Sequence, residues 1–149
     1  MAVLREHPYG RFNFLVDLGT GNTEGPDAGF QECSGIGTRI AVAEYRNGND
    51  RENAPRRIPG LAKVPDVTLK RGIVGSLALF EWIRAVRDGT VDRRTVTIQL
   101  VAEDHSGPVL AWRLLRAFPV AYVAGPLDAR GGEVAMEELT LSCERLELE

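Results

Sequence analysis

The sequence contains few of the residues that metal, redox and covalent chemistry depend on. Its 149 residues include two histidines and two cysteines, far apart and without a metal-ligand or C-x-x-C spacing. The N-terminus has no apolar stretch of the kind found in signal peptides, and no run approaches the ~20 apolar residues of a membrane span. We therefore expect synthesis in the cytosol, with no membrane insertion by this chain. We also expect Cys33 and Cys143 to be buried, unpaired thiols.

Catalytic motifs are also missing. There is no G-x-S-x-G elbow, P-loop or dinucleotide fingerprint. Glu137, Glu138 and Glu144 are interpreted as solvated strand charges, because adjacent residues of a strand point to opposite faces and cannot share a substrate. A net charge of −3 provides no basic field for nucleic acid. The sequence therefore predicts no enzyme, no cofactor and no metal site.

What the chain does have is ordinary globular composition. Hydrophobic residues make up 44% and charged residues 26%, enough apolar surface for one core. The length is typical of a single domain, so residues 1–149 are predicted to form one. Alternating apolar residues predict about seven short strands. These are expected at 12–18, 30–36, 38–45, 67–73, 95–102, 109–118 and 136–148.

One helix is expected, over residues 77–88. Ser76 is suited to its N-cap and Gly89 to the position after its end. Its apolar residues share one broad face, with Leu77 and Phe80 on the opposite, polar side. Strands with a single helix predict a mainly β fold, an antiparallel sandwich or small barrel flanked by that helix.

Residues 46–63 show no regular hydrophobic period. This stretch holds Gly48, Pro55, Pro59 and Gly60 and several charges. Loops longer than about 12–15 residues without structure of their own are uncommon in compact domains and are usually functional or disordered. We therefore interpret 46–63 as an extended loop or arm.

Two strands have a polar face opposite an apolar one. In the closing strand Glu138, Thr140, Ser142 and Glu144 alternate with apolar residues. In the strand at 95–102 the polar positions are Thr95, Thr97 and Gln99. Such alternation is typical of strands that cover a core with one face and meet water with the other.

Read from end to end, the order and spacing of short motifs resemble the inner tail-tube proteins of contractile phage tails and phage-like contractile injection systems. The similarity begins with His7-Pro8-Tyr9 and includes Arg57-Ile58-Pro59-Gly60-Leu61 followed by Asp66-Val67-Thr68-Leu69. It continues through Leu79-Phe80-Glu81-Trp82 and Ala117-Phe118-Pro119 to the closing strand. The polar loop at 19–27 is longer than is usual in the family.

The resemblance implies a β-barrel protomer that forms hexameric rings, stacked into a tube that conducts DNA or protein cargo. Expected partners are other copies of the chain, the surrounding sheath protein, baseplate and tail-terminator proteins, and the cargo. The arm would contact a neighbouring subunit through Arg46, Asn49, Asp50, Arg56, Arg57, Leu61 and Lys63, and the helix through Leu77 and Phe80. The two polar rows would face the lumen, and the protein would end in a phage tail or injection particle.

The sequence is also compatible with three alternative functions. One is a tube-initiating or baseplate-proximal paralogue, which the longer loop at 19–27 leaves open. A second is a tube-like ring protein of a type VI secretion system, which shares the architecture. An enzyme of unknown chemistry is the weakest, since no catalytic constellation was found.

Overall fold

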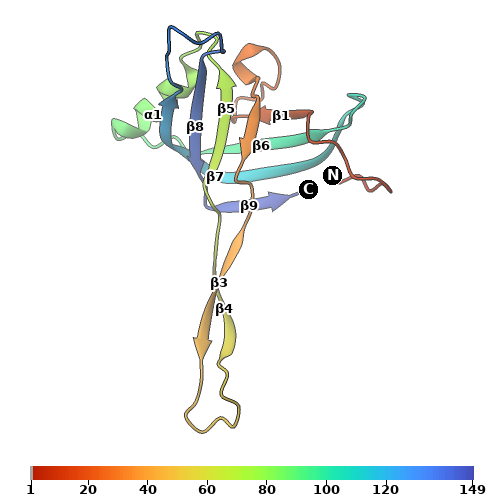
Figure 1. Cartoon of the computed structure of the whole chain (residues 1–149), viewed down its shortest axis with the longest axis vertical. Helices are drawn as coiled ribbons and strands as arrows, with labels where there is room; N and C mark the ends of the chain where they lie inside the picture. Colours follow the sequence, from red (N-terminus) through yellow and green to blue (C-terminus); the bar gives the residue numbers. More distant parts are fainter. Residues whose placement is uncertain (1) are drawn as a thin grey trace.

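The computed structural model describes residues 2–149 and shows a folded β-sheet body with one long projection (Figure 1). The main sheet is antiparallel and contains seven strands in the order β1-β6-β7-β8-β5-β2, with β9 also paired to β7. A separate two-stranded sheet, β3-β4, forms the projection. The mainly β fold predicted from alternation is confirmed.

The strands of the main sheet are short except for one. They are β1 (Phe14–Asp17), β2 (Glu32–Ser34), β5 (Val67–Gly72), β6 (Arg94–Val101), β7 (Pro108–Ala124), β8 (Met136–Ser142) and β9 (Arg145–Leu148). A short 3-10 helix, η1 (Pro26–Ala28), lies in the polar loop after β1. The helix is α1 (Ala78–Arg87), beginning just after Leu77.

Strand β7 joins the two halves of the sheet. Its first part pairs with β6 and β9, and its second part pairs with β8 from Phe118 onward. Arg116, just before the last residue that pairs with β6, has a left-handed backbone with a φ of 54°. The strands β5 and β8 therefore run at a steep angle to β6 and the first part of β7 (Figure 1).

The core lies between the inner faces of the two halves. Val96, Ile98 and Leu114 come from one half, and Leu69 and Leu139 from the other; all are almost fully buried. The helix adds Leu79 and Trp82 to the same cluster. Trp82 also donates from Nε1 to the Asp92 carbonyl at 2.8 Å, which fixes the segment between α1 and β6.

The predicted closing strand at 136–148 is in fact two strands. Strand β8 ends at Ser142 and β9 begins at Arg145, where the partner changes from the second to the first part of β7. Conversely, the strand predicted at 109–118 continues to Ala124. The turn of the sheet at Arg116 explains both differences, because alternation of side chains gives no signal of a change in strand direction.

Candidate assembly surfaces

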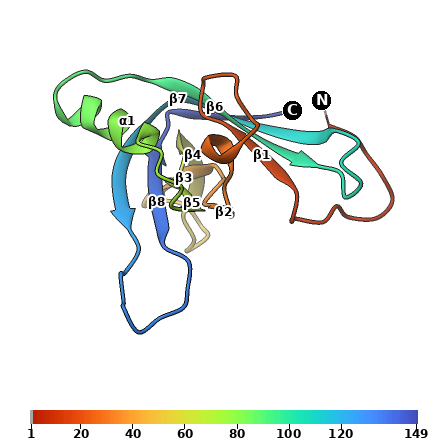
Figure 2. The same ribbon diagram turned by 90° about the horizontal axis from the view of Figure 1, so that it is seen from above.

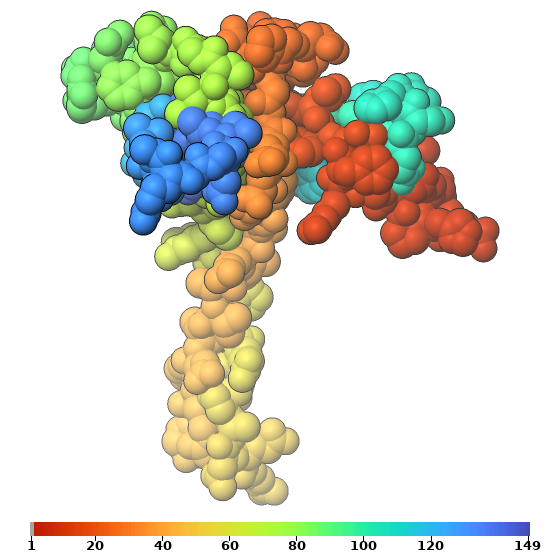
Figure 3. Space-filling view, turned by 45° about the horizontal axis from the view of Figure 1, so that its top comes forward, coloured from red at the N-terminus to blue at the C-terminus, as the bar shows by residue number. Residues whose placement is uncertain are grey.

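The projection is the antiparallel hairpin of β3 (Arg39–Tyr45) and β4 (Arg56–Lys63), which we call the arm. Figure 3 shows it standing clear of the body. The expectation of an irregular loop over 46–63 is wrong for residues 56–63, which are a strand. Alternation failed because both faces of β4 are exposed, and because Gly60 lies beside a register shift near Ile40–Val42. The arm thus spans residues 39–63.

Every residue of the two arm strands is exposed, including large apolar ones. Those more than 45% exposed are Ile40, Val42, Tyr45, Ile58 and Leu61, with Leu61 at 77%. An isolated two-stranded hairpin is marginally stable at best in water. A contiguous exposed apolar surface of this kind marks an interaction site.

The predicted arm residues fall into two groups. Arg46, Asp50 and Arg56 hold the tip of the arm together: Arg46 donates to the Glu52 and Asp50 carbonyls at 3.0 and 2.9 Å, and Arg56 pairs with Asp50 at 3.1 Å. The others are exposed along the arm or at its tip, namely Asn49, Arg57, Leu61 and Lys63. The second group is therefore free to contact another molecule.

The helix presents a second apolar surface. Leu77 is 66% exposed just before α1, and Phe80 is 40% exposed on it. The Phe80 ring meets Tyr122 edge-on, with centroids 5.8 Å apart. The two rings border a groove of about 460 Å³ between α1 and the second part of β7, which also includes Val86, Phe118 and Val120. Ala78, in the first turn of α1 and one of the apolar residues expected on its core-facing side, is exposed.

The two polar rows lie on outward faces, as alternation predicts, but on different halves of the sheet. Thr97 is opposite Asp17 and Arg113 on the half that contains β6. Thr140 is opposite Thr68 on the half that contains β8. Because the core lies between the halves, the two outward faces turn away from each other.

The β8 row belongs to a wider polar face. Lys70 lies across from Glu32 on one side and Glu138 on the other, and its Nζ reaches their carboxylates at 3.4 and 4.0 Å. At the next outward position β2, β5 and β8 carry Ser34, Thr68 and Thr140. This face is therefore made of small hydroxyl side chains and paired charges.

At the other end of the row, Glu144 lies just beyond β8 and pairs with Arg116 and with Arg93. Arg116 is the residue at which β7 turns, so this carboxylate connects the turn of β7 to the segment before β6.

One buried ionic cluster was not predicted from the sequence. Arg71 donates from Nε to Glu137 at 2.7 Å and from Nη1 to the Asp27 carbonyl at 2.8 Å. Tyr122 donates its hydroxyl to the other Glu137 oxygen at 2.5 Å, which raises the pKa of Tyr122. Glu137 is only 4% exposed, so its interpretation as a solvated charge is wrong. The signal was present: Arg71 and Glu137 both continue the apolar alternation of their strands, with opposite charges.

The described part of the chain contains no group of three or more His, Cys, Asp or Glu side chains able to hold a metal. Cys33 and Cys143 are both free; Cys143 is buried and Cys33 is half-buried. No helix within residues 2–149 is long and apolar enough to cross a membrane. The features that stand out are surfaces suited to assembly.

Chains in solved structures of contractile injection systems share the fold of this chain. The chain is similar to the tube-terminating cap of the anti-feeding prophage (27% identity, TM-score 0.84, covering 100% of this chain and 95% of that one). It is equally similar to a chain of the PVC sheath–tube complex in its extended state (26%, 0.84, 97% and 93%). A third match is a chain of the anti-feeding prophage baseplate (26%, 0.82, 97% and 97%).

A match to a family model assigns this chain to a protein family. The model described as T4-like virus tail tube protein gp19 matches residues 10–147, and the chain belongs to that family. It is a tail tube protein of the contractile-injection type, and membership of this structural family implies a non-enzymatic role. Hcp1 from Flavobacterium johnsoniae, at 13% identity and a TM-score of 0.55, shares the fold alone. There is no match among curated proteins.

Proposed function

We propose that this chain is the repeating subunit of the inner tube of a contractile tail or injection particle. Six copies would form a ring, and stacked rings would make a conduit for DNA or protein cargo. The observation that carries the proposal is the fully exposed arm, on a chain whose family and solved relatives are tube components. Cyclic rings of identical subunits are built by contacts between two different faces of each copy, which an asymmetric body with an arm provides.

The partners follow from the same reasoning. One similar chain comes from a sheath–tube complex and another from a baseplate solved with six-fold symmetry. By analogy, the outside of the tube formed by this chain would contact a sheath, and its ends would contact baseplate and terminator proteins. The protein would be made in the bacterial cytoplasm and assembled there into the particle.

Within the tube, the outward face of β2, β5 and β8 is our choice for the lumen wall. Its hydroxyls and its Glu32–Lys70–Glu138 charge ladder offer neither an apolar patch nor a strong net field to hold back passing cargo. The outward row on β6, with Thr95, Thr97 and Gln99, is the alternative choice for the lumen wall, because the two outward faces turn away from each other.

A second candidate is an end-ring paralogue, such as a tube terminator or initiator. It is favoured by the similarity to the anti-feeding prophage cap and to the PVC sheath/tube terminator, the latter at 26% identity. These identities do not differ from that to the sheath–tube chain. Negative-stain microscopy of the purified protein separates the two: open-ended tubes of many rings indicate the repeating subunit, single rings indicate an end ring, and a monomer at all concentrations contradicts both.

The arm provides the sharper test. Replacing residues 39–63 with a short Gly-Ser linker should leave the body folded, because none of them belongs to the core cluster, and should abolish tubes. Leu61→Ser should weaken assembly, whereas Leu127→Ser, at an equally exposed apolar residue of the 125–135 loop, should not. Normal tubes from the linker variant would show that the arm is only a surface hairpin.

A further inference from the structure

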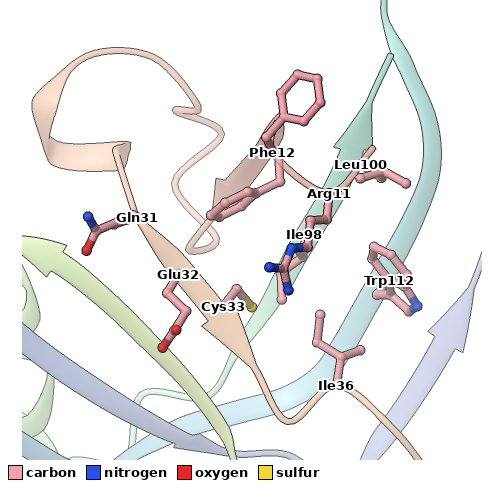
Figure 4. A pocket seen from close by; sticks show the side chains of 10 residues that line it. Arg11, Phe12, Gln31, Glu32, Cys33, Ile36, Ile98, Leu100 and Trp112 are labelled. Carbon is pink, nitrogen blue, oxygen red and sulfur yellow. The ribbon is translucent and has the colours of Figure 1, made fainter. Parts of the chain in front are cut away.

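The main sheet is not closed. Its outermost strands, β1 and β2, do not pair with each other, and a groove of about 530 Å³ lies between them (Figure 4). Apolar side chains from four different strands or their connections line it. They are Phe14, Cys33, Ile36, Ile98, Leu100 and Trp112. Arg11, Phe12, Gln31 and Glu32 line the groove as well.

The groove is continuous with the core, but its apolar side chains are only partly covered. Ile98 is 1% exposed, but Phe14, Cys33, Ile36 and Trp112 pack against the core while remaining only partly buried. Strands β1 and β2 each have a neighbour on one side only, so each presents free N–H and C=O groups along the other. An extended apolar segment would cover the side chains and satisfy those groups, as in β-strand addition.

The arm has the properties that the groove requires. Both of its strands are extended and fully exposed, and they carry Ile40, Val42, Ile58 and Leu61. The eight residues of β4 extend over about 26 Å at the usual rise of a strand. That is about twice the length of the four-residue β1. The arm is therefore long enough to pair along the whole of β1.

Charge favours the same pairing. Residues 39–63 include six basic and three acidic residues, a net charge of +3. The other 124 residues include twelve basic and eighteen acidic residues, a net charge of −6. A basic arm and an acidic body attract each other between copies, and such complementarity sets orientation and speeds encounter.

The arm of the same chain does not occupy the groove. Ile36 borders the groove and the arm begins at Arg39, from where it runs away from the body (Figures 1 and 2). We propose that the groove between β1 and β2 receives the β3–β4 arm of a second copy of this chain, whose apolar side chains cover Phe14, Leu100 and Trp112. This inference rests on the tube assembly proposed above and names the surface that receives the arm.

The half-buried thiol of Cys33 reports on the groove without any substitution. In the wild-type protein, assembly into tubes should slow the reaction of Cys33 with a small methanethiosulfonate at least tenfold relative to unassembled protein. An Ala129→Cys variant provides the matched control, because its thiol lies in the exposed 125–135 loop and should react at similar rates in both states. The modified cysteine is identified by peptide mass spectrometry, which also separates Cys33 from buried Cys143.

Cross-linking then identifies what covers the groove. Ala43→Cys and Ala62→Cys place thiols on β3 and β4 with minimal change in side-chain size. In assembled tubes treated with copper–phenanthroline, at least one of them should form an intermolecular disulfide with Cys33, and Ala129→Cys should form none. Raising the salt before assembly should reduce the cross-link, because the attraction between arm and body is screened.

The outcomes are distinguishable. Tubes in which Cys33 remains reactive and neither arm cysteine cross-links would overturn the groove proposal and leave the tube function standing. Protection of Cys33 with a cross-link only to Ala129→Cys would mean that the 125–135 loop, and not the arm, occupies the groove. Absence of rings and tubes under all conditions would contradict the proposed function itself.

Discussion

At the scale of single residues, the buried Arg71–Glu137 pair is the strongest local constraint in the body. It connects β5 to β8, and through Asp27 and Tyr122 it also holds the loop around η1 and the second part of β7. Arg71 additionally lies over the Phe30 ring at 5.5 Å. Within residues 2–149 its Nη2 atom is buried without a hydrogen-bond partner, so Glu137 is the only carboxylate that compensates the charge. The cluster therefore depends on Glu137.

Glu137→Ala should destabilise the unassembled protomer by about 3–5 kcal/mol, because it leaves a buried guanidinium without its counterion. Urea unfolding followed by circular dichroism measures the change. Glu138→Ala, on the outward face of the same strand, should stay within about 0.5 kcal/mol. The double variant Arg71→Met/Glu137→Leu should recover most of the loss, since an apolar pair of similar volume removes both charges. A loss below about 1 kcal/mol in Glu137→Ala would contradict this role.

A second residue-scale prediction concerns the N-terminal segment. Arg5 donates to both Glu103 oxygens at 2.6 and 2.8 Å, and the Gly10 amide donates to the same carboxylate at 2.6 Å. The hydrogen bond from Arg5, followed by that from Gly10, lowers the pKa of Glu103 to about 2. A carboxyl whose pKa is depressed on folding stabilises the folded contact above its ordinary pKa, and that stabilisation is lost as the pH falls toward 2.

Protection of the Gly10 amide from hydrogen exchange should therefore be greatest from pH 7 to about pH 5 and should fall progressively as the pH drops from about 5 toward 2. In Glu103→Gln the protection should be weaker at every pH and should no longer follow the acid titration. Complete loss of protection above pH 5 in the wild type, or protection that stays unchanged from pH 7 to about pH 2, would show that the Arg5–Glu103 contact is not what holds the segment.

At the scale of elements, alternation located the strands whose two faces differ in environment. Strand β5 was predicted almost to the residue and the start of β8 was predicted correctly, because each buries every second side chain. Strand β4 was not predicted, because neither of its faces packs against the core, so its sequence has no alternation of apolar and polar residues. The end of β8 was missed for a different reason: the side chains keep alternating through Cys143 while the backbone changes partner.

The surfaces show the same division. The arm was recognised from its lack of period together with the family resemblance, yet its extent was underestimated by the whole of β3. The groove between β1 and β2 had no signal in the sequence, since its lining residues come from segments separated by up to about a hundred residues. The hydrophobic pattern of one segment predicts which of its own side chains are buried. A surface formed by several segments can be predicted only when their arrangement in space is known.

The helix allows a direct test of its contact role. Phe80→Asp should weaken ring or tube assembly, because it places a charge in the apolar groove beside α1. The protomer should lose only about 0.5–1.5 kcal/mol, the usual contribution of an edge-on aromatic pair such as Phe80–Tyr122. Leu79→Ala, one residue earlier but 1% exposed, should cost about 2–5 kcal/mol.

Thermal unfolding of the protomer and sedimentation of assemblies measure the two effects separately. If Phe80→Asp destabilised the protomer as much as Leu79→Ala, Phe80 would belong to the core. If it left assembly unchanged, the groove beside α1 would serve no contact between copies.

At the scale of the whole molecule, the segments available for contacts with other molecules lie on different sides of the body. The arm leaves one end of the body, and α1 lies on the side opposite the N-terminal segment and the β6–β7 turn (Figures 1 and 2). The 125–135 loop projects in a further direction (Figure 2). Two different outward faces remain, one on each half of the sheet. A subunit with unlike sides can repeat around a ring, and one with an arm at its end can bind along the axis, so the shape suits both directions of growth.

The last prediction decides which outward face lines the lumen. The face of β2, β5 and β8 carries Thr68 and Thr140 and a neutralising charge ladder, whereas the face of β6 meets the exposed Arg113–Glu149 pair at 3.0 Å. We expect a Thr140→Cys thiol to react with a small maleimide in protomers and tubes alike. It should react at least tenfold more slowly with a maleimide on a large polymer once tubes have formed, because the polymer cannot enter. Thr97→Cys, on the other half, is the matched variant and should remain open to both reagents. Protection of Thr97→Cys instead would move the wall to the β6 half. Equal reactivity of both thiols with both reagents in intact tubes would show that neither face lines the lumen.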